Sequence, residues 1–184
     1  MKRLLFALAV AACSVAFAAP KDAYDIRPEA AKPADAPSSV DWENKNDAAL
    51  KAATADEALA AFVADSAAAE ALLGKVKDAY ATDPMVACQV AAVSQWVMAE
   101  DPWYWLCFDG PHAAGRKVWV RALVKTVRES KADYVRTFCL DQLRWCARPC
   151  AAKCITEAAG ANASKPVSDF AAVVVRELEG KVVR

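Results

Sequence analysis

The sequence predicts an all-α fold, either a stack of helical hairpins or an irregular helical bundle. Alanine is abundant and glycine is scarce, with 5 glycines in 184 residues, a composition that favours helices. From residue 41 onward, apolar residues recur at spacings of three and four, as they do on one face of a helix. No stretch shows the strict apolar–polar alternation that is typical of a half-buried strand.

Residues 1–18 have the layout of a secretory signal peptide. Lys2 and Arg3 come before an apolar run that ends at Phe17, and small residues follow at the expected cleavage site. The run is shorter than the roughly twenty residues that a helix needs to cross a bilayer, so we expect no transmembrane span once the signal is removed. The sequence therefore predicts a secreted or periplasmic protein with a bacterial-type signal. A lipid anchor at Cys13 is the alternative, because the residues before it are similar to the lipobox of bacterial lipoproteins.

Beyond the signal, the chain is expected to divide into a leader and one domain. Residues 19–40 are rich in alanine, proline and charged residues and hold few large apolar side chains, which predicts a flexible leader. Residues 41–184 carry the helical signals and have the size of a single all-α domain. The chain holds 23 basic and 23 acidic residues, so it lacks the basic field that nucleic-acid binding requires.

Start and stop signals divide the domain into about six or seven helices. Thr54 and Glu57 have the spacing of a capping box, and a proline after Asp83 or Asp101 suits the first position of a helix. Gly180 can close the last helix. The expected caps or first residues, in chain order, are Thr54, Ser66, Asp83, Asp101, Arg116, Ser130 and Ser168.

Two pairs of these helices repeat a pattern at a spacing of 49 residues. Each pair consists of an amphipathic helix, a short polar turn and a second amphipathic helix, over 66–80 with 84–99 and over 116–129 with 131–147. Each pair therefore predicts a helical hairpin. The matching positions are Val86, Gln89, Ala91 and Trp96 in the first pair and Val135, Phe138, Leu140 and Trp145 in the second.

The second of these segments, Tyr134 to Trp145, resembles the HEAT-type family of stacked helix pairs in its residues Tyr-Val-Arg-Thr-Phe-Cys-Leu-Asp-Gln-Leu-Arg-Trp. The resemblance covers about residues 66–147, and the insertion over 101–115 makes the repeat longer than the forty-odd residues usual in that family. It implies a stack of helical hairpins that serves as a protein-binding scaffold. An irregular bundle of alanine-rich helices is the alternative.

Cysteine usage predicts a disulfide-stapled domain. Loss of Cys13 with the signal leaves an even number of cysteines in an exported chain, which favours pairing. Cys139 and Cys146 should lie on one helical face about 10 Å apart, too far to bond to each other. Pro149 should turn the chain back, so that two cysteine faces meet. The expected pairs are Cys146–Cys150, Cys139–Cys154 and Cys88–Cys107.

A metal site or a redox-active site built from the same thiols is the alternative to structural disulfides. Four cysteines between 139 and 154 could supply four thiolates. Zinc sites usually use tighter pairs such as C-x2-C, and the sequence contains none. We therefore predict no metal and no cofactor.

A cluster of aromatic and polar residues between the two hairpins is the expected binding site. Three consecutive aromatic side chains cannot all face the core, so at least one should be exposed or cover a groove. Trp119 and Trp145, by contrast, should fill the core. The residues of the expected site are Trp103, Tyr104, Trp105, Asp109 and His112.

These features predict a non-catalytic binding or scaffolding module with a protein or peptide partner. The sequence shows no nucleophile elbow, no zinc-protease helix and no cysteine–histidine arrangement with supporting context, so we assign no catalytic residue. A secreted hydrolase that uses Asp109 and His112 as its acid and base is one alternative. A structural component of the cell envelope is the other.

Overall fold

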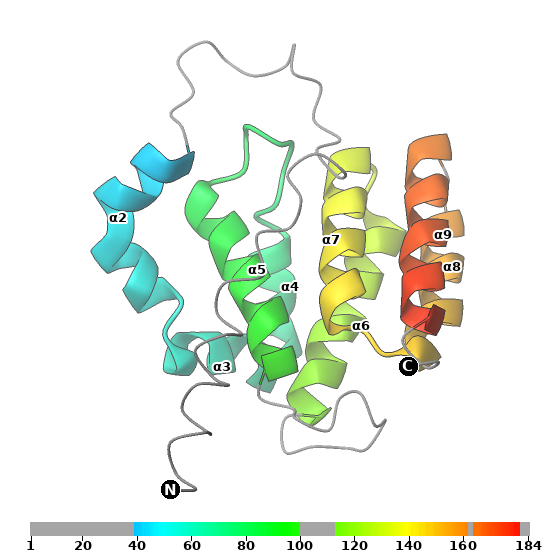
Figure 1. Ribbon diagram of the computed structural model, residues 1–184, viewed down its shortest axis with the longest axis horizontal. Coiled ribbons are helices and arrows are strands. Elements are labelled where there is room, and N and C mark those ends of the chain that lie inside the picture. The colour runs from blue at the N-terminus through cyan, green and yellow to red at the C-terminus, as the bar shows by residue number, and fades with distance from the viewer. Residues whose placement is uncertain (1–38, 100–112, 162–163, 181–184) are drawn as a thin grey trace, which may run out of the picture. The chain divides into compact units, whose positions relative to one another are not determined.

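The computed structural model describes residues 39–99, 113–161 and 164–180, and all of these belong to one compact unit. The described residues form helices and turns without any strand, which confirms the all-α prediction. The expected signal peptide over 1–18 lies outside them, as does the expected leader up to residue 38. In chain order the helices are α2 (Ser39–Ala53), α3 (Asp56–Ala64), α4 (Ser66–Leu73), α5 (Pro84–Ala99), α6 (Ala113–Glu129), α7 (Asp133–Cys146), the short 3-10 helix η4 (Pro149–Ala151), α8 (Ala152–Gly160) and α9 (Lys165–Gly180) (Figure 1).

Six of these helices form two rows that lie against each other (Figure 1). One row is α4, α6 and α8, and the other is α5, α7 and α9. The central helix of each row packs against both of its neighbours in that row, and α6 packs most extensively against α7. Helices α8 and α9 form a further packed pair. This arrangement is compatible with a helical-repeat fold, and it places α6 and α7 at the centre.

The core lies between the two rows and centres on α6 and α7. Trp119 of α6 is the largest fully buried side chain, as the sequence predicted, and its indole Nε1 donates to Ser94 Oγ of α5 over 2.9 Å. The Ser94 hydroxyl in turn donates to Val90 O over 3.1 Å. The buried indole and hydroxyl groups are therefore both satisfied. Other fully buried core residues are Leu123, Leu140, Leu143, Ile155, Val174 and Leu178.

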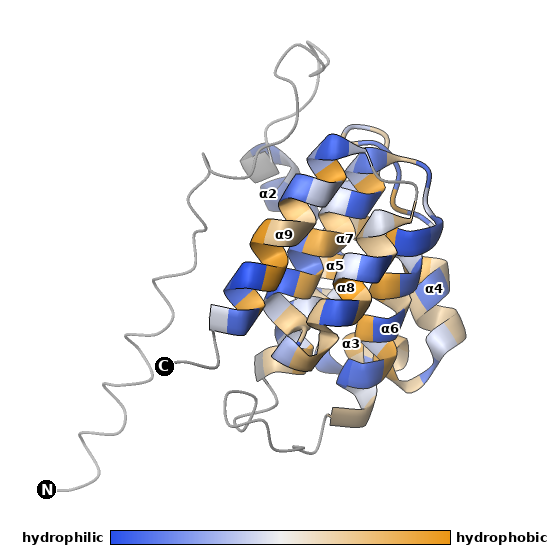
Figure 2. Cartoon of the chain, turned by 90° about the vertical axis from the view of Figure 1, so that its right-hand side faces the viewer, coloured by the Kyte–Doolittle hydropathy of each residue, from blue (hydrophilic) through white to orange (hydrophobic). Residues whose placement is uncertain are grey.

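The helices are amphipathic rather than uniformly apolar. In Figure 2 the turns of α9 that face the viewer change between hydrophobic and hydrophilic colours. This pattern follows from one face packing on α7 and α8 while the other meets solvent. Within the described ranges, we find no helix that combines the length and the apolar character needed to cross a membrane.

Arg136 of α7 is 1% exposed and ties three helices together. Its Nε donates to Val127 O, near the C-terminus of α6, over 3.0 Å. Its Nη2 donates to Ala159 O and Ala161 O at the end of α8, over 2.6 and 2.7 Å. The C-terminus of a helix leaves carbonyl groups without partners and carries a partial negative charge. The buried guanidinium therefore donates hydrogen bonds to carbonyl groups at two helix C-termini and brings positive charge to both.

Helices α3 and α6 cross closely at Gly115. A Cβ atom placed on this residue would lie 3.0 Å from Val63 Cβ of α3, closer than side-chain carbons normally approach. Glycine therefore suits this close crossing, because a larger residue would require Val63 to shift by a few tenths of an ångström.

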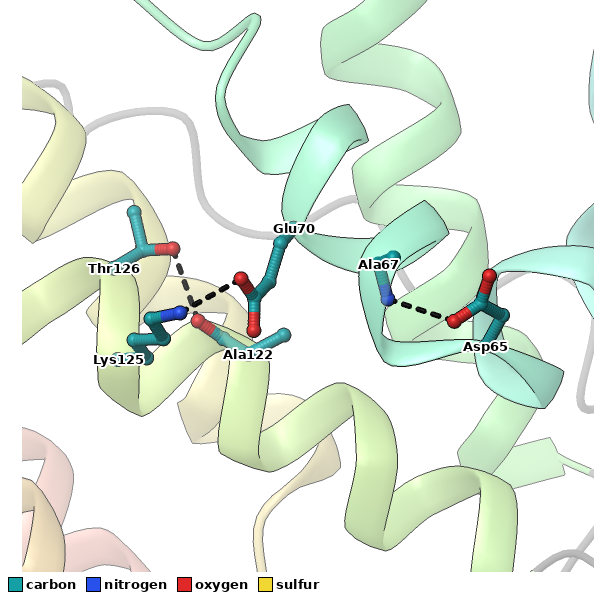
Figure 3. Close-up of polar contacts among 6 residues, drawn as sticks. All are labelled: Asp65, Ala67, Glu70, Ala122, Lys125 and Thr126. Atoms are coloured by element: carbon teal, nitrogen blue, oxygen red, sulfur yellow. Dashed lines mark hydrogen bonds and ion pairs between the residues drawn. The ribbon is translucent and has the colours of Figure 1, made fainter.

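An ion pair on the surface links α4 to α6 (Figure 3). Lys125 Nζ lies 2.7 Å from Glu70 Oε2, and this hydrogen bond raises the pKa of Lys125. Because both side chains are exposed, the pair contributes little to stability. Figure 3 also shows Asp65 Oδ1, which accepts a hydrogen bond from the backbone N–H of Ala67 over 2.9 Å and caps α4.

The starts of the first helices correct two of the predicted caps. Thr54 donates its hydroxyl to Leu50 O over 2.8 Å, and α3 has no side-chain cap. The expected capping box is therefore wrong, because the Thr54 side chain closes the preceding helix instead. Asp65 rather than Ser66 caps α4, and this helix ends at Leu73 because residues 74–83 fold into turns.

Two later helix starts give one confirmation and one correction. Asp83 Oδ1 accepts a hydrogen bond from the N–H of Met85 over 2.9 Å, so the predicted cap before Pro84 is confirmed. The last helix begins at Lys165, three residues earlier than the predicted start at Ser168. Ser164 Oγ accepts from the N–H of Val167 over 3.4 Å there.

Two of the three expected disulfide staples, Cys146–Cys150 and Cys139–Cys154, are wrong. No disulfide joins any of the described cysteines, which are Cys88, Cys139, Cys146, Cys150 and Cys154. Cys139 and Cys146 are fully buried, whereas Cys150 and Cys154 are exposed. The reason is the course of the chain after Pro149, because α8 packs mainly against α6 and α9 and not back on α7. The two cysteine faces therefore do not meet. The third expected pair, Cys88–Cys107, stays a prediction because Cys107 lies outside the described residues.

Candidate functional site

The outward face of α7 carries a line of four half-buried residues, three of them aromatic. Its members are Tyr134, Phe138, Asp141 and Trp145, which we call the α7 strip. Their spacings of four, three and four place them within about 60° of one another around the helix axis. The strip therefore runs along the whole length of the central helix in the row of α5, α7 and α9.

The rest of α7 shows why this face is the outward one. Eight of its residues are buried, and they occupy the directions that face α5, α6 and α9. Arg136 points toward α6 and α8, and Arg144 points toward α9. The strip lies roughly opposite Arg136 around the helix. Packing on three sides thus leaves this face half-buried, and its Tyr134 and Phe138 also pack against the core.

Two of the aromatic rings in the strip are stacked. The ring centroids of Tyr134 and Phe138 lie 6.1 Å apart with an interplanar angle of 26°, as expected for neighbours one turn apart on a helix. Stacking restricts the rotation of both side chains. Binding at this end of the strip would therefore cost little side-chain entropy at the two rings.

An arginine between two carboxylates marks the other end of the strip. The Arg144 guanidinium donates through Nε to Glu177 Oε2 of α9, and its Nη1 lies 3.8 Å from Asp141 Oδ1. The same Cζ atom lies 5.3 Å from the centre of the Trp145 ring, within cation–π range. The three charged groups carry one net negative charge at neutral pH. They join α7 to α9 and hold the Trp145 ring beside a polar cluster.

Burial perturbs one member of this cluster. The pKa of Asp141 is raised above its usual value, chiefly because burial disfavours the carboxylate. The neighbouring Arg144 lowers the pKa and Glu177 raises it again. The carboxylate form of Asp141 is therefore less stable in the folded protein than in water, although its side chain is still partly exposed to solvent.

Helix α9 extends the apolar surface beside the strip. Phe170, Val173 and Glu177 lie on one flank of α9 at spacings of three and four, and all three are half-buried. Because Glu177 contacts Arg144, this flank faces α7. Phe170 also packs against the core. The contact of Glu177 with Arg144 links this flank to the charged end of the strip.

The sequence and the structure point to different residues. The predicted binding residues Trp103, Tyr104, Trp105, Asp109 and His112 lie outside the described part of the chain. Sequence reasoning placed Trp145 in the core, but it is half-buried on the α7 strip. The spacing of the strip was readable from the sequence. Which side of α7 would face solvent was not, because both sides carry large apolar residues.

The described thiols and carboxylates do not form a metal site with three or more ligands. Among the described residues no three or more His, Cys, Asp or Glu side chains come together to hold a metal ion. Burial, with Cys146 nearby, raises the pKa of the Cys139 thiol to about 12. Burial and the nearby Glu43 and Asp83 raise the pKa of Cys88. Neither thiol is activated as a nucleophile.

Comparisons with known proteins give no relative for this chain. No protein-family model matches it, and neither a curated protein nor a solved structure is similar to it. The HEAT-type resemblance therefore rests on the sequence pattern and on a fold that is compatible with stacked helical hairpins.

Proposed function

We propose that this protein is an exported, non-catalytic binding module of the HEAT-like helical type, whose α7 strip docks a protein or peptide partner. The observation that carries the proposal is the strip itself, with three half-buried aromatic residues in line on the central helix of one row. Aromatic residues and arginine are enriched among the residues that dominate binding energy at protein interfaces.

The charge beside the strip indicates the chemistry of the partner. Asp141, Arg144 and Glu177 bear one net negative charge next to the Trp145 ring. A partner with apolar side chains and a basic residue would satisfy both parts of this surface, since the basic residue can contact a carboxylate while its neighbours pack on the rings. We therefore propose an amphipathic, basic segment as the docking element.

Site-directed photo-crosslinking tests the docking surface. A photoreactive amino acid would replace Phe138 on the strip or, as a matched control, the exposed Arg121 on α6, and the cells would be irradiated before lysis. We expect one specific adduct from position 138 and none from position 121. The same adducts from both positions, or none from either, would contradict docking on the strip.

A truncation of the key aromatic residue tests the energetics. Once the crosslinked partner is identified, Trp145→Ala should weaken binding to the purified partner by about tenfold or more. Tyr80→Ala removes an exposed aromatic residue on the turns between α4 and α5 and should leave the affinity unchanged. Equal affinities for the Trp145 variant and the parent protein would remove Trp145 from the proposed site.

The mass of the natively exported protein tests export and processing. A mass that begins at residue 19 would support cleavage of a signal peptide, and a mass that begins at a lipid-modified Cys13 would support an anchored form. Recovery of the full-length chain from the cytoplasm alone would contradict the proposed export.

A further inference from the structure

Cys150 and Cys154 are the two exposed thiols of the described residues. They belong to one continuous helical stretch, because η4 ends at Ala151 and α8 begins at Ala152. The backbone at Ala151 and at Ala152 has right-handed helical angles, with φ of −81° and −52°. The 3-10 step after Cys150 rotates by about 120° and each of the next three steps by about 100°, which gives about 420° in total. The two thiols therefore lie on the same face, one turn apart.

The spacing suits a bridging ion better than a disulfide. Side chains four residues apart on a helix have Cβ atoms about 5–6 Å apart, whereas a disulfide needs roughly 3.5–4.5 Å. Two metal–sulfur bonds of about 2.3 Å, arranged in line, need sulfur atoms about 4.6 Å apart. Side-chain rotation can reach this separation without any change in the helix.

The number of available thiols selects the kind of ion. Cys139 and Cys146 are fully buried in the core, and no larger group of ligands forms among the described residues. A structural zinc ion takes four ligands, and two accessible thiols do not supply that number. Soft thiolate ligands favour soft cations, and two-coordinate linear geometry is typical of monovalent d10 ions.

We propose that Cys150 and Cys154 form a two-thiolate site for a soft monovalent d10 cation of the Cu(I) or Ag(I) type. Binding forms two metal–sulfur bonds, and each thiol gives up its proton, so that one cation enters, two protons leave and no electron is transferred. The product carries one negative charge at the start of α8, where the helix dipole favours an anion. The exposed Lys153 lies between the two cysteines in sequence, and its Nζ is 3.9 Å from Glu157 Oε1.

Silver ion is the probe for this site, because it is monovalent and needs no reductant. The full chain, with its thiols reduced, would be mixed with one equivalent of Ag⁺ in excess monothiol and then treated with an alkylating reagent. Peptide mass spectrometry would measure the alkylation rate at each cysteine separately. We expect Ag⁺ to slow alkylation of Cys150 and Cys154 together by at least about tenfold, since a chelating pair outcompetes single thiols.

Variants distinguish a chelate from binding to single thiols. In Cys150→Ser, alkylation of Cys154 should become insensitive to Ag⁺, and Cys154→Ser should have the reciprocal effect. The combination of Ala152→Cys with Cys154→Ser keeps the number of thiols but moves one to another face of the helix, and should also lose protection. Continued protection in any of these variants, or none in the parent protein, would overturn the proposal. Cys88→Ser should leave protection intact.

Discussion

Helices α2 and α7 have similar lengths, 15 and 14 residues, but they are held in place in different ways. Helix α7 packs against α5, α6 and α9, and eight of its residues are buried. From residue 41 to residue 53 no side chain of α2 is buried, and its main contacts are with α3 and α5. Helix α7 is therefore stabilised by buried packing, whereas α2 forms without a buried side chain from residue 41 to residue 53.

Interactions between residues one turn apart contribute to the order of α2. Lys51 Nζ lies 2.8 Å from Asp47 Oδ2 one turn away, and Asn46 donates its amide to Trp42 O over 2.8 Å. Gln89 Nε2 of α5 donates to Ala53 O over 3.2 Å and links the end of α2 to the rest of the unit. Exposed pairs of this kind stabilise a helix by only about 0.2–0.5 kcal/mol each. Helix α2 should therefore open more readily than α7.

A matched pair of leucine truncations should show the largest difference between the two helices. Leu140→Ala in α7 removes a fully buried side chain and should cost about 2–5 kcal/mol of the free energy of unfolding. Leu50→Ala in α2 removes a half-buried one and should cost less than about 1 kcal/mol. Urea unfolding followed by circular dichroism measures both. Equal losses would show that α2 is as firmly held as α7.

Loss of the Arg136 guanidinium should have the next largest effect. Arg136→Met keeps the stem of the side chain but leaves the carbonyls of Val127, Ala159 and Ala161 without this donor. We expect a loss of about 3 kcal/mol or more, because unsatisfied buried polar groups are costly. The control Arg121→Met changes an exposed arginine on α6 and should stay within about 0.5 kcal/mol of the parent. Similar values for the two variants would contradict the role of Arg136 at the helix ends.

The contact at Gly115 should have an intermediate effect. Gly115→Ala places a methyl group 3.0 Å from Val63 Cβ and should cost about 1–3 kcal/mol through overpacking. Val63→Ala should relieve much of this cost when the two changes are combined, which a double-mutant cycle measures. Gly160→Ala meets no atom within 4 Å and should be neutral or slightly stabilising. Additive effects at 115 and 63 would show that the close approach is not the cause.

The smallest expected effect is a gain in stability at Asp141. Because its folded-state pKa lies above the ordinary 3.8, the folded protein binds this proton more tightly than the unfolded chain. The carboxylate therefore lowers stability as the pH rises past about 4 and costs nothing below that. Asp141→Asn should raise the free energy of unfolding at pH 7 by less than about 1 kcal/mol and lose that gain near pH 3. A destabilised variant at pH 7 would mean that the contact with Arg144 outweighs the cost of burial.

Sequence reasoning succeeded where local chemistry decides the structure. The proline after Asp83 defined the start of α5 at Pro84, and the helical hairpin over 116–147 corresponds to α6 and α7. Sequence reasoning failed where a side chain has two possible hydrogen-bond partners. Thr54 could cap the next helix or close its own, and it closes its own.

The cysteines show the same limit at longer range. The spacing of Cys139 and Cys146 placed both on one face, and both are indeed buried. Their expected partners, Cys154 and Cys150, are exposed because α8 packs on α6 and α9. A pattern along the chain cannot indicate which neighbouring helix will cover a face, since that choice depends on the packing of all the rows together.

Helix propensity, capping and proline act over a few residues, so the helical class of the fold and several helix boundaries could be predicted from the amino-acid sequence. Three features could not be predicted in this way: the face of α7 that is partly open to solvent, the role of Arg136 at the ends of α6 and α8, and the exposure of Cys150 and Cys154 on one turn of helix. These outcomes depend on how helices pack against one another. That packing is set by the sum of many contacts between residues distant in sequence.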